Sequence, residues 1–328
     1  MTVLVTGGAG YIGAHAVRAL LRAGRRVAIL DDLSTGHRDT VPDEVPLCVA
    51  DIADAGAVGA FIAAQGVSAV LHFAARSLVG ESVADPRKYW RDNVAGSVAL
   101  LGAVVDAGVR DVVVSSTAAV YGVPERSPLD EAHRTNPVNP YGATKLAVER
   151  ALADYAAAYP LRYAALRYFN AAGADPDAGL GERHDPETHL IPRVLRSASE
   201  GCEVAIHGTD WDTRDGTCVR DYVHVRDLAD AHVAALRHLE AGGAGGAFNL
   251  GTGTGSSVRE VIDVVAKVTG RPLRVVEGPR RAGDPPVLVA DATRASRELG
   301  FSAARSSLRQ VVEDAWAFER GRSGAGGL

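Results

Sequence analysis

The sequence predicts an α/β fold built on a doubly wound parallel sheet, and two features of its first half carry this prediction. Short, almost continuously apolar segments typical of buried strands alternate with longer helical segments. A glycine-rich turn stands between the first strand and the first helix. After Asn170 the pattern becomes less regular, which predicts a smaller α/β domain. We expect a first domain at residues 1–170, to which segments near 225–250 return, and a second domain at 171–328.

The first strand, Val3–Val5, runs into a turn with glycine at positions 7, 10 and 13, and a helical pattern follows as far as Ala23. Gly7 lets the backbone turn tightly, Gly10 lets a pyrophosphate approach the helix N-terminus, and Gly13 lets the helix lie close to the strand. A glycine motif alone is weak evidence. Its place between a strand and a helix makes it typical of a Rossmann-type dinucleotide site.

The next strand, Arg26–Leu30, ends in Asp31. A carboxylate at this point binds an adenosine ribose and repels a 2′-phosphate, which favours NAD over NADP. Further strands are predicted at 47–50, 69–73 and 111–115, and helices at 53–64, 86–107 and 140–158. Ligands of such sheets lie at the carboxyl ends of the strands, so one edge should carry Gly7, Asp31, Asp51, Phe73, Ala74 and Thr117.

The stretch from Asn139 to Lys145 predicts an acid–base pair. Asn139 can cap a helix and Pro140 suits its first turn, so Tyr141 and Lys145 fall one helical turn apart on one face. A neighbouring ammonium favours the phenolate, so the pair can act as a general base. Thr117, at the end of the preceding strand, can exchange a proton with this phenol. The structural alternatives are a helix-surface pair and a capping threonine.

The composition excludes several other classes of protein. The chain has 328 residues, of which 47% are hydrophobic, and a formal charge of −5. A sequence pI of about 6.1 argues against nucleic acid or an anionic membrane as the main partner. The beginning of the chain has no basic signal region, and no apolar run is long enough to span a membrane. Three widely spaced cysteines predict neither disulfides nor a zinc knuckle, so we expect a cytoplasmic protein without a metal site.

Further motifs extend the pattern over most of the chain, and they are His72–Ala75, Val79–Ser82, Asn93, Ser115–Tyr121, Leu166–Asn170, Val219–His224, Asn249–Gly251 and Arg280–Asp284. With the glycine turn and the Tyr141–Lys145 pair, they resemble the extended short-chain dehydrogenase/reductase superfamily and, within it, the UDP-glucose 4-epimerase family. The resemblance runs from residue 2 to about residue 318, and it includes the loop 208–217 before Val219.

The resemblance implies an enzyme that holds NAD tightly and interconverts UDP-galactose and UDP-glucose through a 4-keto sugar. Tyr141 would take the proton of the 4′-hydroxyl, directly or through Thr117, while Lys145 would hold the nicotinamide ribose and depress the pKa of Tyr141. The implied cofactor contacts are Gly7, Gly10, Tyr11, Ile12, Gly13, Asp31, Asp51, Ile52, Phe73, Ala74, Asn93, Tyr141, Lys145 and Tyr168. The implied substrate contacts are Thr117, Asn170, His189, Leu190, Ala205, His207, Arg220, Arg280, Asp284 and Leu288. The resemblance also implies a homodimer formed through helices 86–107 and 140–158.

Several positions depart from the family pattern. Thr117 replaces a serine and keeps its hydroxyl, whereas Ser77 stands where some members carry a lysine near the cofactor, with Arg76 beside it. His189 replaces an asparagine at the diphosphate loop, and His207 occupies a position that is often aromatic beside the uracil. Leu288 is intermediate in size between the tyrosine associated with plain hexoses and the small residue associated with N-acetylated ones. We expect efficient turnover of UDP-hexoses and weak turnover of UDP-N-acetylhexosamines.

Three alternatives stay open at this point. A 4-epimerase of a UDP-uronate or UDP-pentose would share every motif. A nucleotide-sugar 4,6-dehydratase needs an acid pair where this chain has Ala118 and Ala119, and a non-catalytic NAD sensor would not need Tyr141 and Lys145. At the end of the chain, Gly321–Leu328 shows no apolar periodicity and predicts a frayed tail.

Overall fold

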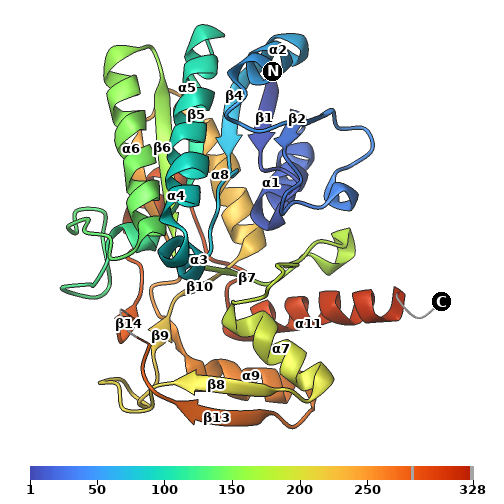
Figure 1. The fold of residues 1–328 in the computed structure, drawn as a ribbon, viewed down its shortest axis with the longest axis vertical. Coiled ribbons are helices and arrows are strands. Elements are labelled where there is room, and N and C mark those ends of the chain that lie inside the picture. The colour runs from blue at the N-terminus through green and yellow to red at the C-terminus, as the bar shows by residue number, and fades with distance from the viewer. Residues whose placement is uncertain (282–283, 326–328) are drawn as a thin grey trace.

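The larger part of the molecule is a seven-stranded parallel sheet with helices on both faces (Figure 1). The structure is a computed structural model that describes residues 1–281 and 284–325. In sheet order the strands are β11 (Gly246–Leu250), β6 (Arg162–Tyr168), β5 (Asp111–Thr117), β4 (Val67–His72), β1 (Thr2–Thr6), β2 (Arg26–Asp31) and β3 (Leu47–Val49). The chain crosses from β3 to β4 over β1, so the strand order reverses next to β1. The predicted doubly wound sheet is therefore confirmed.

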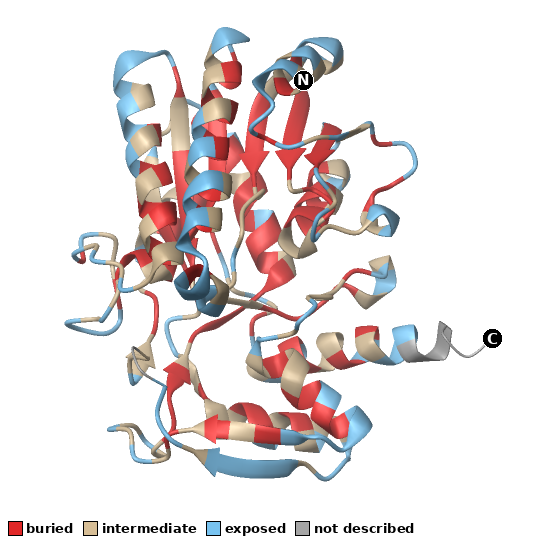
Figure 2. Cartoon of the chain, in the orientation of Figure 1, coloured by how far each residue is buried: buried red, intermediate tan, exposed pale blue. Residues whose placement is uncertain are grey.

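Two apolar layers cover the sheet. On one face α1 (Tyr11–Arg22) and α8 (Val225–Glu240) pack side by side over the sheet residues Val3, Val5 and Ile29. On the other face α2 (Ala55–Gln65), α5 (Gly96–Asp106) and α6 (Pro140–Ala158) cover Leu4, Val70 and Val112. Figure 2 shows the central strands buried and the outer sides of the helices exposed. Burial on both faces explains why the strands are almost continuously apolar.

The segment predicted as one helix at 86–107 is divided into three parts. Helix α4 (Pro86–Tyr89) leads into a π-helical stretch at Trp90–Ala95, which continues into α5. Asp85 caps this helix by accepting a hydrogen bond from the backbone N–H of Lys88. A short helix α3 (Val79–Ala84) precedes it, and single 3₁₀ turns lie at Arg38–Thr40, Ala118–Val120 and Pro176–Ala178.

The smaller part lies beyond the carboxyl ends of the sheet strands, in the lower half of Figure 1. Strands β8 (Glu203–His207) and β13 (Arg274–Gly278) pair in parallel. Their apolar core is shared with α7 (Leu190–Glu200), α9 (Val258–Thr269) and α11 (Leu308–Ala325). This core contains Val204, Ile206, Val261 and Val311, so the second half has an apolar cluster of its own.

Short paired strands connect the two parts. Strand β7 (Asn170–Ala172) pairs with β10 (Tyr222–His224), and β9 (Val219–Arg220) lies between β12 (Ser256–Ser257) and β14 (Val287–Leu288). Helix α10 (Thr293–Leu299) returns to the larger part, where it packs against α8 and β11. The chain therefore crosses between the two parts several times, and the border between them is not one cut at residue 170.

The end of the chain differs from the expectation for a frayed tail. Helix α11 continues to Ala325, so the tail expected from Gly321 is wrong for residues 321–325, and residues 326–328 lie outside the described residues. The first turns of α11 carry Val311 and Val312, both fully buried, and this apolar anchor lets the helix extend beyond the core. In the described part of the chain, no helix combines the length and apolarity needed to cross a membrane.

Candidate active site

A deep cleft lies at the carboxyl ends of the sheet strands, with a cavity volume of about 430 Å³. Both the glycine turn after β1 and Leu288 of β14 line it. Seventeen sequence-predicted site residues line it, namely Gly7, Gly10, Tyr11, Ile12, Gly13, Asp31, Asp51, Ile52, Phe73, Ala74, Thr117, Tyr141, Lys145, Tyr168, Asn170, His189 and Leu288. The topology thus brings the predicted cofactor and catalytic residues to one cavity.

The glycine turn has the geometry of an anion site. Gly7 has a φ of +70°, and a Cβ added there would lie 2.6 Å from the backbone nitrogen of Ala74. A Cβ on Gly13 would lie 2.1 Å from the carbonyl oxygen of Gly7, so only glycine permits this contact between helix and strand. Helix α1 begins at Tyr11 without a side-chain cap, which leaves its first N–H groups free for a phosphate.

The carboxylate at the end of β2 is suited to bind a ribose. The Asp31 carboxylate accepts hydrogen bonds from the backbone N–H groups of Ala9, at 2.9 Å, and Leu33, at 2.8 Å. Burial raises the pKa of Asp31, and the two backbone hydrogen bonds partly offset this effect. The fixed carboxylate lies on the cleft wall beside the turn, so the donor set and the shape of the cavity fit a dinucleotide.

Arg76 gives the cleft a cationic group next to Ser77, the position where some family members carry a lysine. Its guanidinium lies 2.9 Å from the carboxylate of Asp92 and 3.8 Å from that of Asp32, and it donates to Ser34 at 3.0 Å. Arg76 therefore belongs to the wall beside Asp31, whereas Ser77 lines the cleft without a charge.

The acid–base pair stands on the first turns of α6. The Asn139 side chain accepts a hydrogen bond from the N–H of Gly142 at 2.9 Å, and Pro140 occupies the first turn, as the sequence predicts. Tyr141 and Lys145 both line the cleft. A hydrogen bond joins Tyr141 to Thr117, whose Oγ1 also accepts from the N–H of Ala119 at 3.1 Å. The threonine thus serves both as a cap and as a partner of the phenol.

The protonation of this pair differs from the expectation. Burial raises the pKa of Tyr141 to about 12, and the hydrogen bond with Thr117 only partly offsets this effect. Burial also lowers the pKa of Lys145 to about 8. The Lys145 ammonium donates to the carbonyl oxygen of Ser115 at 2.9 Å. Desolvation of the phenolate therefore dominates, so the pKa of Tyr141 is raised rather than depressed, and the effect expected of Lys145 on this phenol stays a prediction.

Of two further predicted cofactor residues, Asn93 supports the cleft wall from behind and Tyr168 reaches the cleft. Asn93 is 1% exposed and does not line the cleft. Its side chain accepts from the N–H of Arg76 at 2.7 Å and donates to Thr144 at 3.1 Å, which connects the cleft wall to α6. Tyr168 does reach the cleft, and its hydroxyl is hydrogen-bonded to the hydroxyl of Ser115. Burial raises the pKa of Tyr168 well above its ordinary value.

The predicted substrate residues divide into two groups. Asn170, His189 and Leu288 line the cleft, whereas six others lie outside its lining, namely Leu190, Ala205, His207, Arg220, Arg280 and Asp284. Their role as substrate contacts stays a prediction.

The two arginines of that group are already occupied by acids. Arg220 lies 3.4 Å from the carboxylate of Asp284, and Arg280 lies 2.7 Å from that of Asp210 and 4.2 Å from the centre of the Trp211 ring. Residues 282 and 283 of the motif between Arg280 and Asp284 lie outside the described residues. The sequence did not predict these acidic partners.

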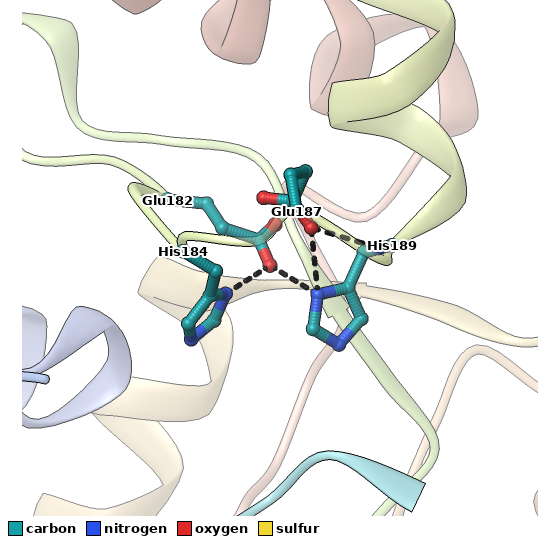
Figure 3. Close-up of side chains that lie close together, drawn as sticks. All are labelled: Glu182, His184, Glu187 and His189. Atoms are coloured by element: carbon teal, nitrogen blue, oxygen red, sulfur yellow. Dashed lines mark hydrogen bonds and ion pairs between the residues drawn. The ribbon is translucent and has the colours of Figure 1, made fainter. Parts of the chain in front are cut away.

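A cluster that the sequence analysis missed lies on the same wall (Figure 3). The Glu182 carboxylate is 2.8 Å from Nδ1 of His184 and 2.6 Å from Nδ1 of His189. Glu187 lies 3.1 Å from Nδ1 of His189. Burial disfavours the charged groups, but the hydrogen bonds outweigh it, lowering the pKa of Glu182 to about 2 and raising that of His189 to about 10. His189 thus turns its Nδ1 to acids, which was not expected. The spacing of the four residues was the available signal.

The chain is similar to known proteins over nearly its whole length. Residues 3–251 match the NAD dependent epimerase/dehydratase family. The UDP-glucose 4-epimerase of Halalkalibacterium halodurans is 48% identical over 321 residues, which cover 98% of this chain and 96% of that protein. The crystal structure of the UDP-glucose 4-epimerase from Brucella ovis in complex with NAD is 48% identical, with a TM-score of 0.94 over 96% of this chain and 97% of the other.

A further solved structure shows a different ligand in a close structural neighbour. The UDP-glucose 4-epimerase from Stenotrophomonas maltophila, with bound NAD and formylated UDP-arabinopyranose, is 43% identical. Its TM-score is 0.96, and the similarity covers 99% of each chain.

Proposed function

The chain belongs to the NAD dependent epimerase/dehydratase family, and on this basis we propose that it interconverts UDP-galactose and UDP-glucose with NAD as its cofactor. It is an isomerase that inverts C4 of the sugar through a 4-keto intermediate. The observation that carries the proposal is the cleft itself, in which Tyr141, hydrogen-bonded to Thr117, shares one cavity with the glycine turn and Asp31.

NAD fits the cofactor end of this cleft. The free N–H groups at the start of α1 would hold its pyrophosphate, and Asp31 would bind the adenosine ribose through its two oxygens. Tyr11, Ile12, Asp51, Ile52, Phe73 and Ala74 line the same wall. Bound NAD would supply the reversible hydride acceptor that oxidation and reduction at C4 of the sugar require.

The chain supplies the proton transfer. As the phenolate, Tyr141 would take the proton from the C4 hydroxyl, with Thr117 in position to relay it, and would later return it. Lys145, whose ammonium donates to the carbonyl of Ser115, would supply the cation that favours the phenolate before it takes the proton. Because the keto sugar must present both of its faces, the hexose has to be held loosely while the nucleotide is held firmly.

The nucleotide half of the substrate belongs to the smaller part of the molecule. Asn170 and Arg220, with Arg280, would anchor the diphosphate, which is a suitable grip because it lies far from the reacting carbon. Arg220 and Arg280 would exchange Asp284 and Asp210 for phosphate oxygens. The remaining proposed contacts are His189, Leu190, Ala205 and His207.

Leu288 supports a preference among sugars. It lies at the end of the cleft, on β14, and packs against the cluster that contains Ala118 and Tyr121. A side chain of this size next to the hexose leaves room for a hydroxyl at C2 and crowds an acetamido group. We therefore propose efficient turnover of UDP-hexoses and weak turnover of UDP-N-acetylhexosamines.

A UDP-pentose is the second candidate substrate class, because a close structural neighbour carries formylated UDP-arabinopyranose. A 4,6-dehydratase is disfavoured, since Ala118 and Ala119 line the cleft without a carboxylate. The test is to incubate the purified protein, without added NAD, with UDP-galactose, UDP-xylose and UDP-N-acetylglucosamine, and to separate the products by chromatography. We expect UDP-glucose from UDP-galactose as the fastest reaction. No product from any UDP-hexose, even with NAD supplied, would refute the proposal.

We also propose that the protein is a homodimer that pairs through α5 and α6. These helices pack together, and apolar side chains on their side of the molecule are exposed, including Trp90 and Val98. Light scattering after gel filtration should give twice the chain mass of 34.2 kDa. Val98→Glu should give monomers, whereas Val275→Glu, at an equally exposed valine on β13, should not. A monomeric parent protein would contradict the proposal.

A further inference from the structure

Four metal-ligand side chains converge on one point of the cleft wall. They come from the short segment between β7 and α7, in the spacing Glu182-x-His184-x-x-Glu187-x-His189. One ligand atom from each lies within 4.8 Å of the ligand atoms of the other three. Figure 3 shows both imidazole Nδ1 atoms directed at the carboxylate of Glu182, with Glu187 next to His189.

The donor set suits a divalent transition metal. Two imidazole nitrogens and two carboxylate oxygens are ligands that Zn²⁺ accepts in a tetrahedral site, with bonds of about 2.0–2.2 Å. Donors in such a tetrahedron are about 3.3–3.5 Å apart. The donor contacts of Glu182 and Glu187 with the imidazoles measure 2.6 to 3.1 Å. To admit an ion at their centre, the three contacting pairs would have to move apart by less than about 1 Å, and donors that lie near the 4.8 Å limit would have to move closer.

The charge of the cluster also favours a cation. The side chains of Glu182 and Glu187 are only 7% and 3% exposed. Within the described residues, their ion pairs are with the two imidazoles, and a single protonated imidazole would offset only one of the two buried negative charges. Arg183, the arginine inside the segment, is directed away and pairs with Asp39 at 2.6 Å. A salt bridge to arginine therefore does not account for this arrangement.

The cluster links two elements that shape the cleft. His189 is the residue before α7, and its backbone N–H donates to Glu187 at 2.7 Å. The His184 ring packs edge-on against the ring of Tyr11, at the start of α1, with centroids 6.4 Å apart. Glu182, His184 and His189 all line the cavity. Anything that fixes this cluster also fixes the wall between the glycine turn and α7.

We propose that Glu182, His184, Glu187 and His189 bind one divalent transition-metal ion, Zn²⁺ in the first instance, which holds this wall of the cleft in place. The ion has no part in the proton transfer by Tyr141. Its effect on substrate affinity rests on the proposed function, because the wall faces the UDP-sugar. Binding of the ion itself does not depend on that function.

The test uses the full chain without a histidine tag, freed of metal by a chelator that is then removed. Isothermal titration with Zn²⁺ measures affinity and stoichiometry, and titration with Co²⁺ gives a visible absorption band if the site is tetrahedral. The variants are His189→Asn, Glu187→Gln and Glu182→Gln. His238→Asn is the control, because His238 is a half-buried histidine on α8, outside the cluster. Circular dichroism identifies the variants that are folded. Because all three ligand exchanges are conservative, at least one folded ligand variant is expected.

We expect one tightly bound ion per chain in the parent protein and in His238→Asn. Loss of a ligand should weaken binding by at least about 100-fold, since even residues that only orient ligands change affinity by about 10–100-fold. Equal binding by any folded ligand variant, or no stoichiometric binding by the parent protein, would overturn the proposal. Metal removal should raise KM for UDP-galactose several-fold and leave kcat within about twofold. An unchanged KM would overturn the role in holding the wall, whereas a protein that binds the ion but lacks epimerase activity would refute only the proposed function.

Discussion

Replacing Tyr141 with phenylalanine removes the proposed base with little change in shape. The lost hydroxyl makes a hydrogen bond with Thr117, and Thr117 keeps its other contact, with the N–H of Ala119 at 3.1 Å. One hydrogen bond contributes about 0.5–1.5 kcal/mol to the free energy of unfolding. The melting temperature should therefore fall by no more than about 4 °C. Turnover should fall by about 10²–10⁴-fold, the usual contribution of a general base.

The assay couples UDP-glucose formed from UDP-galactose to UDP-glucose dehydrogenase and follows NADH at 340 nm. The variant should retain its nucleotide, which is measured by chromatography after denaturation. Thr117→Ser, which keeps the hydroxyl, should remain within about threefold of the parent rate, since the loss of a methyl group leaves the relay intact. If Tyr141→Phe kept more than a tenth of the parent rate, Tyr141 would not be the base.

Tyr141→Phe should also change how the free energy of unfolding depends on pH in alkaline solution. Burial raises the pKa of Tyr141 to about 12 in the folded protein, above the unfolded value of about 10. The neutral phenol therefore contributes stability that is fully present below pH ~10 and is lost as the pH rises toward 12. Phenylalanine cannot ionise, so the variant should gain about 1.4 kcal/mol on the parent for each pH unit above 10. In urea unfolding, the parent should have the larger free energy of unfolding at pH 9 and the variant should have the larger one at pH 11. A difference between the two proteins that is the same at both pH values would contradict the assigned shift.

Three further substitutions test the site and its support. Gly13→Ala places a Cβ 2.1 Å from the carbonyl oxygen of Gly7, so the purified protein should lose its nucleotide, and retention of a full equivalent would contradict the close helix–strand contact. Glu149→Gln breaks a buried ion pair with Arg167, which should lower the free energy of unfolding in urea by about 3–5 kcal/mol, and a loss below about 1 kcal/mol would show that the pair is dispensable. Leu288→Tyr should lower turnover of UDP-N-acetylglucosamine relative to UDP-glucose by at least about tenfold, and an unchanged ratio would remove Leu288 as a steric gate.

The regular part of the fold was readable from the sequence because its signals are local. Asn139 and Pro140 mark the first turn of α6, and the helix occupies Pro140–Ala158, as expected. The strand predicted at Arg26–Leu30 is likewise found as β2, which ends one residue later at Asp31. The strands β9, β12 and β14 have two residues each and were not predicted. Their pairing depends on contacts between distant segments, for which no periodic pattern exists in so short a run.

The sequence predicted those site residues whose positions follow from the topology of the sheet alone. Asp31 and Thr117 follow from their places at strand ends, since parallel strands bring these ends together. The acids that pair with Arg220 and Arg280 could not be predicted, because a guanidinium accepts many partners and the loop conformation decides among them. Glu182 and His189 were likewise visible as residue types, yet their segment is neither helix nor strand, so spacing did not give their geometry.

The pKa values of Tyr141 and Lys145 bear on how the base acts. Burial raises the pKa of Tyr141 to about 12, so the phenol is neutral near neutral pH unless a cation favours the phenolate. A neutral phenol cannot take up a proton, so Tyr141 must be ionised when the C4 hydroxyl gives up its proton. The Lys145 ammonium, fixed by the carbonyl of Ser115, is the cation that the chain supplies to favour the phenolate. Lys145→Ala should therefore lower kcat more than it changes KM for the UDP-sugar, and an effect confined to KM would show that Lys145 acts in binding alone.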